Sequence, residues 1–230
     1  MSVQNEFSKH ANEYNSYNII QQIVAKSLVR DIQKQPKRML ELGCGSGQIF
    51  KHINWDVDFY KAIDFSHSMC ELHPKASNVE VNCYNFDTPE FIDAIKNDRY
   101  DLVLSASALQ WSKDLDKIIG TLAKITPEVN AVLFTSNTFK TIQKISQKPS
   151  PILDIESIKS AFSNHFECEF EIFNYNLEFD NKKDLFDYIK KSGVSGGKSL
   201  SFKDAKKLYK AYDLNYLEFE VIFIKAFSIS

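Results

Sequence analysis

Arginine is nearly absent from this chain of 230 residues: Arg30, Arg38 and Arg99 are its only examples. Bidentate guanidinium contacts are therefore scarce, and recognition of a phosphate or carboxylate must depend mostly on lysines or backbone amides. The four cysteines (Cys44, Cys70, Cys83 and Cys168) lack the spacing of metal ligands. We expect reduced thiols and no metal site.

The sequence also contains no apolar run long enough to cross a membrane. Its first residues lack the basic and apolar regions of a secretory signal, and the formal net charge is -2. A nearly neutral chain does not favour a global electrostatic grip on nucleic acid. We therefore expect a cytoplasmic protein that binds neither membranes nor nucleic acid.

What is present is an ordinary globular composition, 43% hydrophobic and 25% charged, in which apolar runs alternate with helical patterns. Helical spacing from Asn18 to about Gln35 ends at Pro36. Such alternation predicts a parallel sheet with right-handed crossovers. The expected strands of this part are 38–42, 59–64, 79–84, 100–105 and 131–135, with a helix starting near Gly47 and another over 115–125.

The last third of the chain changes character. Residues 166–173 alternate apolar and acidic, as in a half-buried strand, and residues 219–227 read as a more buried final strand. A lysine-rich helical segment lies between them, from about Lys182 to Tyr212. Its lysines are typical of a solvated helical face, although they would also suit an acidic partner protein.

The most specific motif is the stretch 39–47, an apolar strand that reaches Glu41 and then enters the turn Gly43-Cys44-Gly45-Ser46-Gly47. Asp64 ends the next apolar run, where a ribose-binding acid belongs in a doubly wound sheet. A dinucleotide fingerprint would have its third glycine at Gln48, and Glu41 would repel a pyrophosphate. A ligand with an adenosine end and a cationic amino acid end fits better. The motif resembles motif I of class I S-adenosylmethionine (SAM) methyltransferases.

This resemblance implies SAM as the cofactor. Asp64 would then bind the ribose hydroxyls, although it could also act as the N-cap of the next helix, a position for which Ser66 competes. Asp87 would bind the adenine amino group, or act as the N-cap of a helix beginning near Pro89, or do both. The full set of expected cofactor residues is Glu41, Gly43, Cys44, Gly45, Gly47, Asp64, Phe65, Phe86, Asp87 and Ser105.

Three further segments make the resemblance specific to one family of these methyltransferases. They are Ala108-Leu109-Gln110-Trp111, residues 7–14 with Gln21-Gln22 downstream, and residues 190–196. Together they resemble the malonyl-acyl carrier protein (ACP) O-methyltransferases of biotin synthesis. That family implies an α/β, doubly wound, mostly parallel seven-stranded sheet of the Rossmann-like class I type. Its last strand is antiparallel, and it carries a helical cap insertion. We expect one methyltransferase domain over 1–230, with a helical lid over 1–36 and the insertion over 180–214.

The implied reaction moves a methyl group from SAM to the free carboxylate of malonyl-ACP, which could dock on the Lys182–Lys210 region. A carboxylate is already ionised at neutral pH, so we expect no catalytic base. The histidines show no pairing spacing and read as surface or packing residues. Segment 137–142 departs from the family pattern, and Lys140, Lys144 and Lys148 are candidates by location for holding the malonyl carboxylate. The expected substrate-facing residues are Tyr14, Ser105, Leu109, Gln110 and Trp111.

Two other functions stay open from the sequence alone. The chain could methylate another small molecule, such as a free dicarboxylic acid or a quinone precursor, or it could bind SAM or a partner without catalysis. A nucleotide-dependent dehydrogenase is disfavoured, because Gln48 occupies the position of the glycine that its fingerprint needs.

Overall fold

A single seven-stranded sheet forms the centre of the computed structural model, which describes residues 18–191 and 201–229. The strand order is β3-β2-β1-β4-β5-β7-β6. Strands β1 to β5 pair in parallel, whereas β7 is antiparallel to both of its neighbours. The strands are β1 (Arg38–Leu42), β2 (Phe59–Asp64), β3 (Val79–Cys83), β4 (Leu102–Ala106), β5 (Glu128–Phe134), β6 (Phe166–Glu178) and β7 (Tyr216–Ser228). The predicted fold class is confirmed.

Successive residues of the buried strands point to opposite faces of the sheet and divide the core into two layers. On β1, Met39 belongs to the layer that contains Val24 of α2 (Ile19–Arg30), and Leu40 to the layer that contains Phe162 of α7 (Ile155–Ser163). Both faces are covered by helices, which is why these strands read as continuous apolar runs. Glu41 follows Leu40 and therefore faces the same side as Met39.

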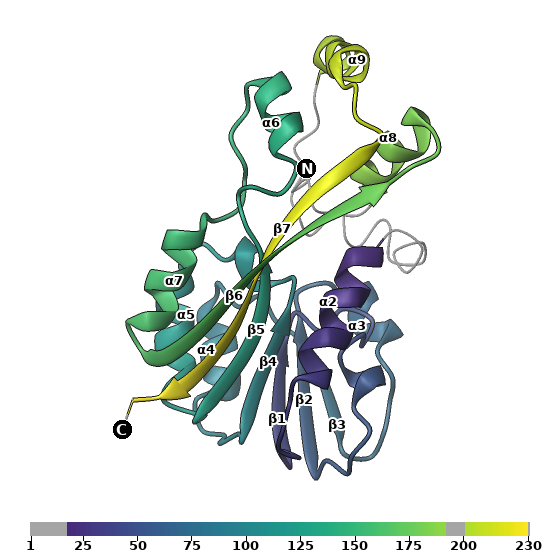
Figure 1. The fold of residues 1–230 in the computed structure, drawn as a ribbon. Coiled ribbons are helices and arrows are strands. Elements are labelled where there is room, and N and C mark those ends of the chain that lie inside the picture. The colour runs from purple at the N-terminus through teal and green to yellow at the C-terminus, as the bar shows by residue number, and fades with distance from the viewer. Residues whose placement is uncertain (1–17, 192–200, 230) are drawn as a thin grey trace.

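Helices cover both faces, as Figure 1 shows, with α2 and α3 on one side and α4, α5 and α7 on the other. The carboxyl ends of β1 to β5 point toward α6, α8 and α9. The α-helices are α2 (Ile19–Arg30), α3 (His67–Leu72), α4 (Pro89–Ile95), α5 (Leu115–Leu122), α6 (Lys140–Ser146), α7 (Ile155–Ser163), α8 (Lys182–Lys191) and α9 (Phe202–Ala211). Two 3₁₀ turns, η2 (Phe50–His52) and η3 (Leu109–Trp111), complete the described elements.

Strands β6 and β7 form a long hairpin that extends past the end of β5. Helices α8 and α9, which we call the helical cap, connect the two strands at this extended end. The Phe179 amide donates to the Asn215 carbonyl at 2.8 Å, so the chain enters and leaves the cap at neighbouring points. Buried Leu185 and Tyr188 of α8 and Leu208 of α9 join the core layer of α2.

Several predicted boundaries differ from the structure. Helix α2 ends at Arg30, five residues before Gln35, because the chain turns at Asp31 to reach β1. The helix expected near Gly47 is only the 3₁₀ turn η2, since three positive-φ glycines precede it and interrupt regular helical geometry. Strands β6 and β7 are both longer than predicted. No helix within the described ranges is long and apolar enough to span a membrane.

Candidate cofactor site

The glycine turn after β1 has an unusual backbone, with φ of +73° at Gly43, +50° at Gly45 and +79° at Gly47. A Cβ on Gly43 would lie 2.0 Å from the Cβ of Ala108, and one on Gly47 would lie 2.5 Å from Pro74 Cδ. A Cβ on Gly45 would meet no atom within 4 Å. Two glycines are therefore needed for close packing against neighbouring loops, whereas the third faces open space where a ligand could approach the backbone.

Asp64 connects the end of β2 to this turn. Its Oδ2 accepts the Gly45 amide at 2.9 Å, and its Oδ1 accepts the Ser66 amide at 2.8 Å. Ser66, and not Asp64, occupies the N-cap position of α3. Each carboxylate oxygen keeps a further lone pair, so the group can still accept hydroxyl donors from a ligand. Burial raises the pKa of Asp64 to about 6.

Glu41 is 2% exposed and lies beneath the glycine turn. The Tyr60 hydroxyl from β2 donates to its Oε2, and His73 Nε2 lies 4.0 Å from the same oxygen. Burial raises the pKa of Glu41, while the neighbouring Tyr60 and His73 oppose that rise. Cys44 is buried within the turn. The acid expected at the cationic end of the cofactor thus has two buried polar neighbours.

After β3, Asp87 connects two loops. Its Oδ1 accepts the Lys113 amide at 2.9 Å, and its own amide donates to Asn85 Oδ1 at 2.9 Å. Thr88 occupies the N-cap position of α4, so the alternative role of Asp87 as that N-cap is not seen. Half-buried Phe86 lines a small cavity of about 90 Å³ beside Asp87 and Lys113. Phe65, the remaining expected cofactor residue, is half-buried after β2.

The end of β4 reaches the same edge of the sheet as the glycine turn. The Ser105 hydroxyl, fully buried, donates to the Leu42 carbonyl at 2.9 Å and so joins β4 to β1. Ser107 has a φ of +59°, and its buried hydroxyl oxygen has no hydrogen-bond partner among the described residues. Backbone strain of this kind is typical of binding and catalytic sites.

The turn η3 contains the three apolar and amide residues expected to face the substrate. Leu109 is fully buried in the core layer of α5 and α7. Gln110 donates from Nε2 to the Ser107 carbonyl at 2.8 Å, and Trp111 is half-buried. Leu109 therefore holds the turn against the core, while the Gln110 amide braces the strained backbone at Ser107.

The segment after β5 is held by two glutamates of β7. Glu220 accepts from the Asn137 side-chain amide at 2.9 Å, and Glu218 accepts from the Thr141 amide at 3.0 Å. Lys140 Nζ lies 3.9 Å from Glu218 Oε1. These contacts attach the segment after β5 to the last strand.

Lysines dominate the exposed side of the helices above the sheet edge. Helices α6 and α9 contact each other, and their exposed lysines form what we call the lysine surface. Asp204 at the start of α9 donates its amide to Ser201 and dilutes the positive charge. The lysine surface comprises Lys140, Lys144, Lys203, Lys206, Lys207 and Lys210.

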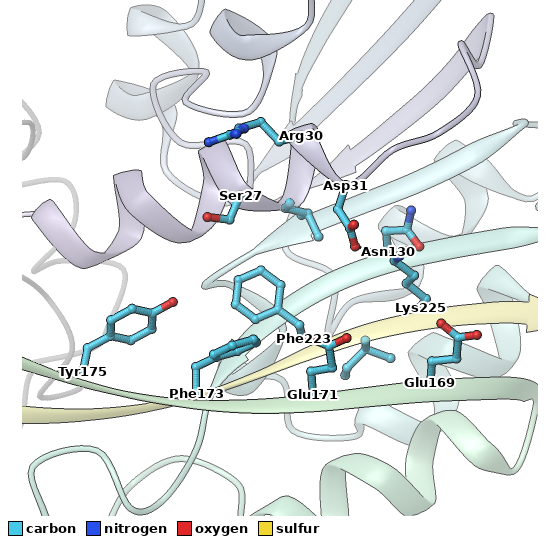
Figure 2. Close-up of a pocket in the computed structure, with 12 residues that line it drawn as sticks. Ser27, Arg30, Asp31, Asn130, Glu169, Glu171, Phe173, Tyr175, Phe223 and Lys225 are labelled. Atoms are coloured by element: carbon cyan, nitrogen blue, oxygen red, sulfur yellow. Dashed lines mark ion pairs between the residues drawn. The ribbon is translucent and has the colours of Figure 1, made fainter.

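A cavity of about 430 Å³ lies away from this edge, between α2 and the β6–β7 hairpin (Figure 2). Phe173 and Phe223 pack edge to face along it, with ring centroids 5.4 Å apart. Lys225 Nζ lies 2.7 Å from Asp31, and the pKa of this lysine is raised chiefly by Asp31, with Glu169 among the further contributors. Because Lys225 is paired with Asp31 and two packed aromatic rings line the cavity, we interpret it as structural.

The sequence reading did not single out Tyr60 or Ser107, and it treated His73 as a surface or packing residue. His73 is indeed packed, since it is 2% exposed, but its contact with Glu41 was not foreseen. No spacing in the sequence signals that contact. Tyr14, expected near the cofactor or substrate, lies outside the described residues, as do residues 192–196 of the third family segment.

Comparison with known proteins agrees with this geometry. Residues 40–127 match a family described as a methyltransferase domain. The fold resembles that of the YcgJ protein from Bacillus subtilis, with a TM-score of 0.66 and 15% identity over 90% of this chain and 99% of that one. It also resembles a SAM-dependent methyltransferase from Thermotoga maritima, with a TM-score of 0.59 and 14% identity over 98% and 99%. Residues 40–127 are thus similar to a methyltransferase domain, and the chain shares the fold of class I SAM-dependent methyltransferases, which supports the expected enzyme class and its expected cofactor, SAM.

Within that class, one group of relatives shares a single name. A malonyl-[acyl-carrier protein] O-methyltransferase of Bacillus cytotoxicus is 24% identical over 91% of this chain and 81% of that protein. The protein of the same name from Haemophilus influenzae is 23% identical over 84% of this chain and 77% of its own length. The family resemblance that the sequence motifs indicated is confirmed.

Proposed function

We propose that this enzyme transfers a methyl group from SAM to the free carboxylate of a malonyl thioester carried by ACP, a step of biotin synthesis. The similarity to relatives of that name over most of the chain is the observation that carries the proposal. We place the reaction in the cytoplasm, where thiols stay reduced, because all four cysteines are free.

The glycine turn fits the cofactor. Open space beside Gly45 admits a ligand to the backbone, and Asp64 keeps lone pairs for the ribose hydroxyls. Glu41 would attract the ammonium group of the amino acid end, and Asp87 would lie at the adenine end. The bound cofactor would supply the reactive methyl group. The other proposed contacts are Gly43, Cys44, Gly47, Phe65, Phe86 and Ser105.

The chain's own residues need to do little chemistry. A carboxylate with an ordinary pKa of about 4 is ionised at neutral pH and is already a nucleophile. The protein must align its oxygen with the methyl group, exclude water and avoid excessive stabilisation of the anion. We therefore assign no general base. We propose that Ser107, Gln110 and Trp111 position the substrate, with Leu109 supporting the turn from the core and Tyr14 contributing from the N-terminal lid.

We further propose that ACP docks on the helical cap. Carrier proteins of this acidic type would be attracted to the lysine surface, and salt would weaken the attraction. Lys140 is engaged with Glu218. The exposed Lys144 and Lys148 are therefore the better candidates for binding the malonyl carboxylate. In this proposal residues 1–230 form one domain, with 1–36 as lid and 180–214 as cap.

The experiment that tests the reaction is transfer of labelled methyl from SAM to malonyl-ACP, malonyl-coenzyme A and free malonate in parallel. Mass spectrometry of the products would locate the methyl group. A methyl ester on malonyl-ACP is the expected result. Turnover of the free acid alone would move the enzyme to another small-molecule substrate, and SAM binding without any transfer would indicate a binding protein.

The cofactor contacts are tested separately with Asp64→Ala, which removes the acceptor for the Gly45 amide and the proposed ribose contact. We expect SAM binding to weaken by about tenfold or more, since a hydrogen bond to a charged group contributes about 1.5 to 3 kcal/mol. Calorimetry measures the dissociation constant. Unchanged affinity in a folded variant would refute the placement of the cofactor.

Docking is tested by reversing two charges of the lysine surface, Lys206→Glu and Lys207→Glu. The expected result is a higher KM for malonyl-ACP with an unchanged KM for SAM, and a smaller dependence of KM on salt. Lys124→Glu is the matched control, because Lys124 is an exposed lysine that follows α5, far from the cap. An equal effect of the control would contradict docking on α9.

A further inference from the structure

A buried histidine beneath the glycine turn has no role in the reaction proposed above. His73 directly follows α3, and its side chain is completely buried. A Cβ on Gly47 would lie 3.1 Å from His73 Cδ2, so the ring packs directly against the turn. Its other ring neighbours are Phe50 of η2, at 5.5 Å between centroids, and Tyr60 of β2, at 6.3 Å.

The hydrogen bonds of the ring determine which nitrogen carries the variable proton. His73 Nδ1 lies 2.9 Å from the Pro74 carbonyl oxygen, which can only accept, so Nδ1 carries a hydrogen in every state. Nε2 faces Glu41 Oε2 at 4.0 Å and has no hydrogen-bond partner among the described residues. A neutral ring therefore presents a lone pair to the carboxylate, whereas a protonated ring presents a positively charged N–H.

In the described part of the chain, three titratable groups surround the ring of His73. Glu41 from β1 and Tyr60 from β2 face the ring, and Cys70 faces it from α3. Burial lowers the pKa of His73, but the Glu41 carboxylate, the Pro74 carbonyl and Cys70 together raise it by more and leave it above its ordinary value. Burial likewise raises the pKa of Glu41. Glu41 and His73 therefore share one proton. Loss of this proton near neutral pH changes the net charge of the pair beneath the glycine turn.

We propose that His73 is a positioning residue that acts through Glu41 and makes the binding of SAM depend on pH. The inference rests on the proposed role of Glu41 at the ammonium end of the cofactor. A protonated His73 neutralises Glu41, and the cofactor's ammonium group would then face a pair without net charge. When the proton leaves, the full negative charge of Glu41 is available to the ammonium group. Binding therefore releases a proton, and affinity increases with pH.

Calorimetry with S-adenosylhomocysteine tests this inference on the whole protein between about pH 6 and about pH 8, the range in which histidines titrate. Release of one proton makes the affinity rise by about tenfold per pH unit below the pKa of the pair. Repeating the titration in buffers of different ionisation enthalpy counts the released protons. Asp64 also titrates near this range, with a pKa of about 6, and its contribution has to be separated.

5′-Methylthioadenosine provides that separation, because it contains the ribose that Asp64 would bind but lacks the amino acid end. Its pH dependence measures the share of Asp64, and the additional dependence seen with S-adenosylhomocysteine measures the share of the Glu41–His73 pair. We expect the additional dependence to disappear in His73→Gln and to persist in His67→Gln. His67 is the matched control, an exposed histidine at the start of α3.

The outcomes are distinct. Additional proton release in the wild type that is lost only in His73→Gln supports the inference. Tight binding of S-adenosylhomocysteine with no additional pH dependence would overturn it and leave the proposed function intact. Failure of the wild type to bind S-adenosylhomocysteine at any pH would overturn both. If His73→Gln does not fold, the two-ligand comparison on the wild type still decides, since equal proton release with both ligands would refute the inference.

Discussion

The close approach of Gly43 to Ala108 gives a quantitative prediction for Gly43→Ala. The new Cβ would lie 2.0 Å from the Ala108 Cβ, so the loop after β4 would have to move. Overpacking of this kind costs about 1 to 3 kcal/mol. The φ of +73° adds about 1 to 2 kcal/mol for any residue with a Cβ. We therefore expect the free energy of unfolding to fall by about 2 to 5 kcal/mol.

Gly45→Ala is the matched comparison, because Gly45 also has a positive φ but a Cβ there meets nothing within 4 Å. Only the backbone cost of about 1 to 2 kcal/mol should remain. Since the added methyl group enters the space proposed for the ligand, this variant should instead lose cofactor affinity. Urea denaturation followed by circular dichroism measures the stability, and calorimetry measures the affinity.

A second substitution tests the cause of the instability. Gly43→Ala combined with Ala108→Gly removes one of the two clashing Cβ atoms and should regain about 1 to 3 kcal/mol relative to Gly43→Ala alone. The single variant Ala108→Gly provides the baseline of the cycle, because glycine itself destabilises slightly. Absence of any recovery, or a Gly43→Ala variant as stable as Gly45→Ala, would refute the proposed contact between the two loops.

Three further predictions concern the buried polar groups. The folded protein holds the Asp64 proton more tightly than the unfolded chain does, because its pKa is raised from 3.8 to about 6. The unfolding free energy should thus fall by about 3 kcal/mol as pH rises from about 4 to about 6, and Asp64→Asn should lack this contribution in urea titrations at several pH values. Tyr60→Phe removes the hydrogen bond to buried Glu41, and should lower the unfolding free energy by about 1.5 to 3 kcal/mol; an unchanged melting temperature would show that the bond contributes nothing. Ser105→Ala removes the bond to the Leu42 carbonyl and should cost about 1 kcal/mol in the same urea assay, a result that a stabilised variant would contradict.

The central strands could be predicted from the sequence, and the outer hairpin only in part. The bounds of β1 and β2 agree with the structure because each is a short apolar run that ends at a turn or an acid. Strand β6 was expected over 166–173 but continues to Glu178. Its last five residues include two asparagines, which do not favour a strand. They are held by pairing with β7, such as Glu178 with Tyr216. A local sequence pattern cannot predict a contact between residues so far apart in the chain.

The same difference between local and distant signals applies to the candidate site. Gly43, Gly45 and Asp64 could be predicted as candidates because their spacing reflects the geometry of one turn and two adjacent strands. The contact of His73 with Glu41 joins residues from β1 and the end of α3, whose proximity follows from the packing of the helix on the sheet. The left-handed backbone at Ser107 was likewise not foreseen, since serine has no special preference for positive φ.

The hydrogen bond between Phe179 and Asn215 has a consequence for how such an enzyme could diversify. Because the chain leaves and rejoins the hairpin at one place, the segment between these residues can be lengthened, shortened or exchanged without shifting the register of β6 against β7. Mutations at its exposed positions would accumulate without disturbing the glycine turn, whereas buried Leu185, Tyr188 and Leu208 share a core layer with Cys44 of that turn and are constrained. With the cap in its proposed docking role, acceptor choice and cofactor binding could thus evolve largely as separate traits within one polypeptide.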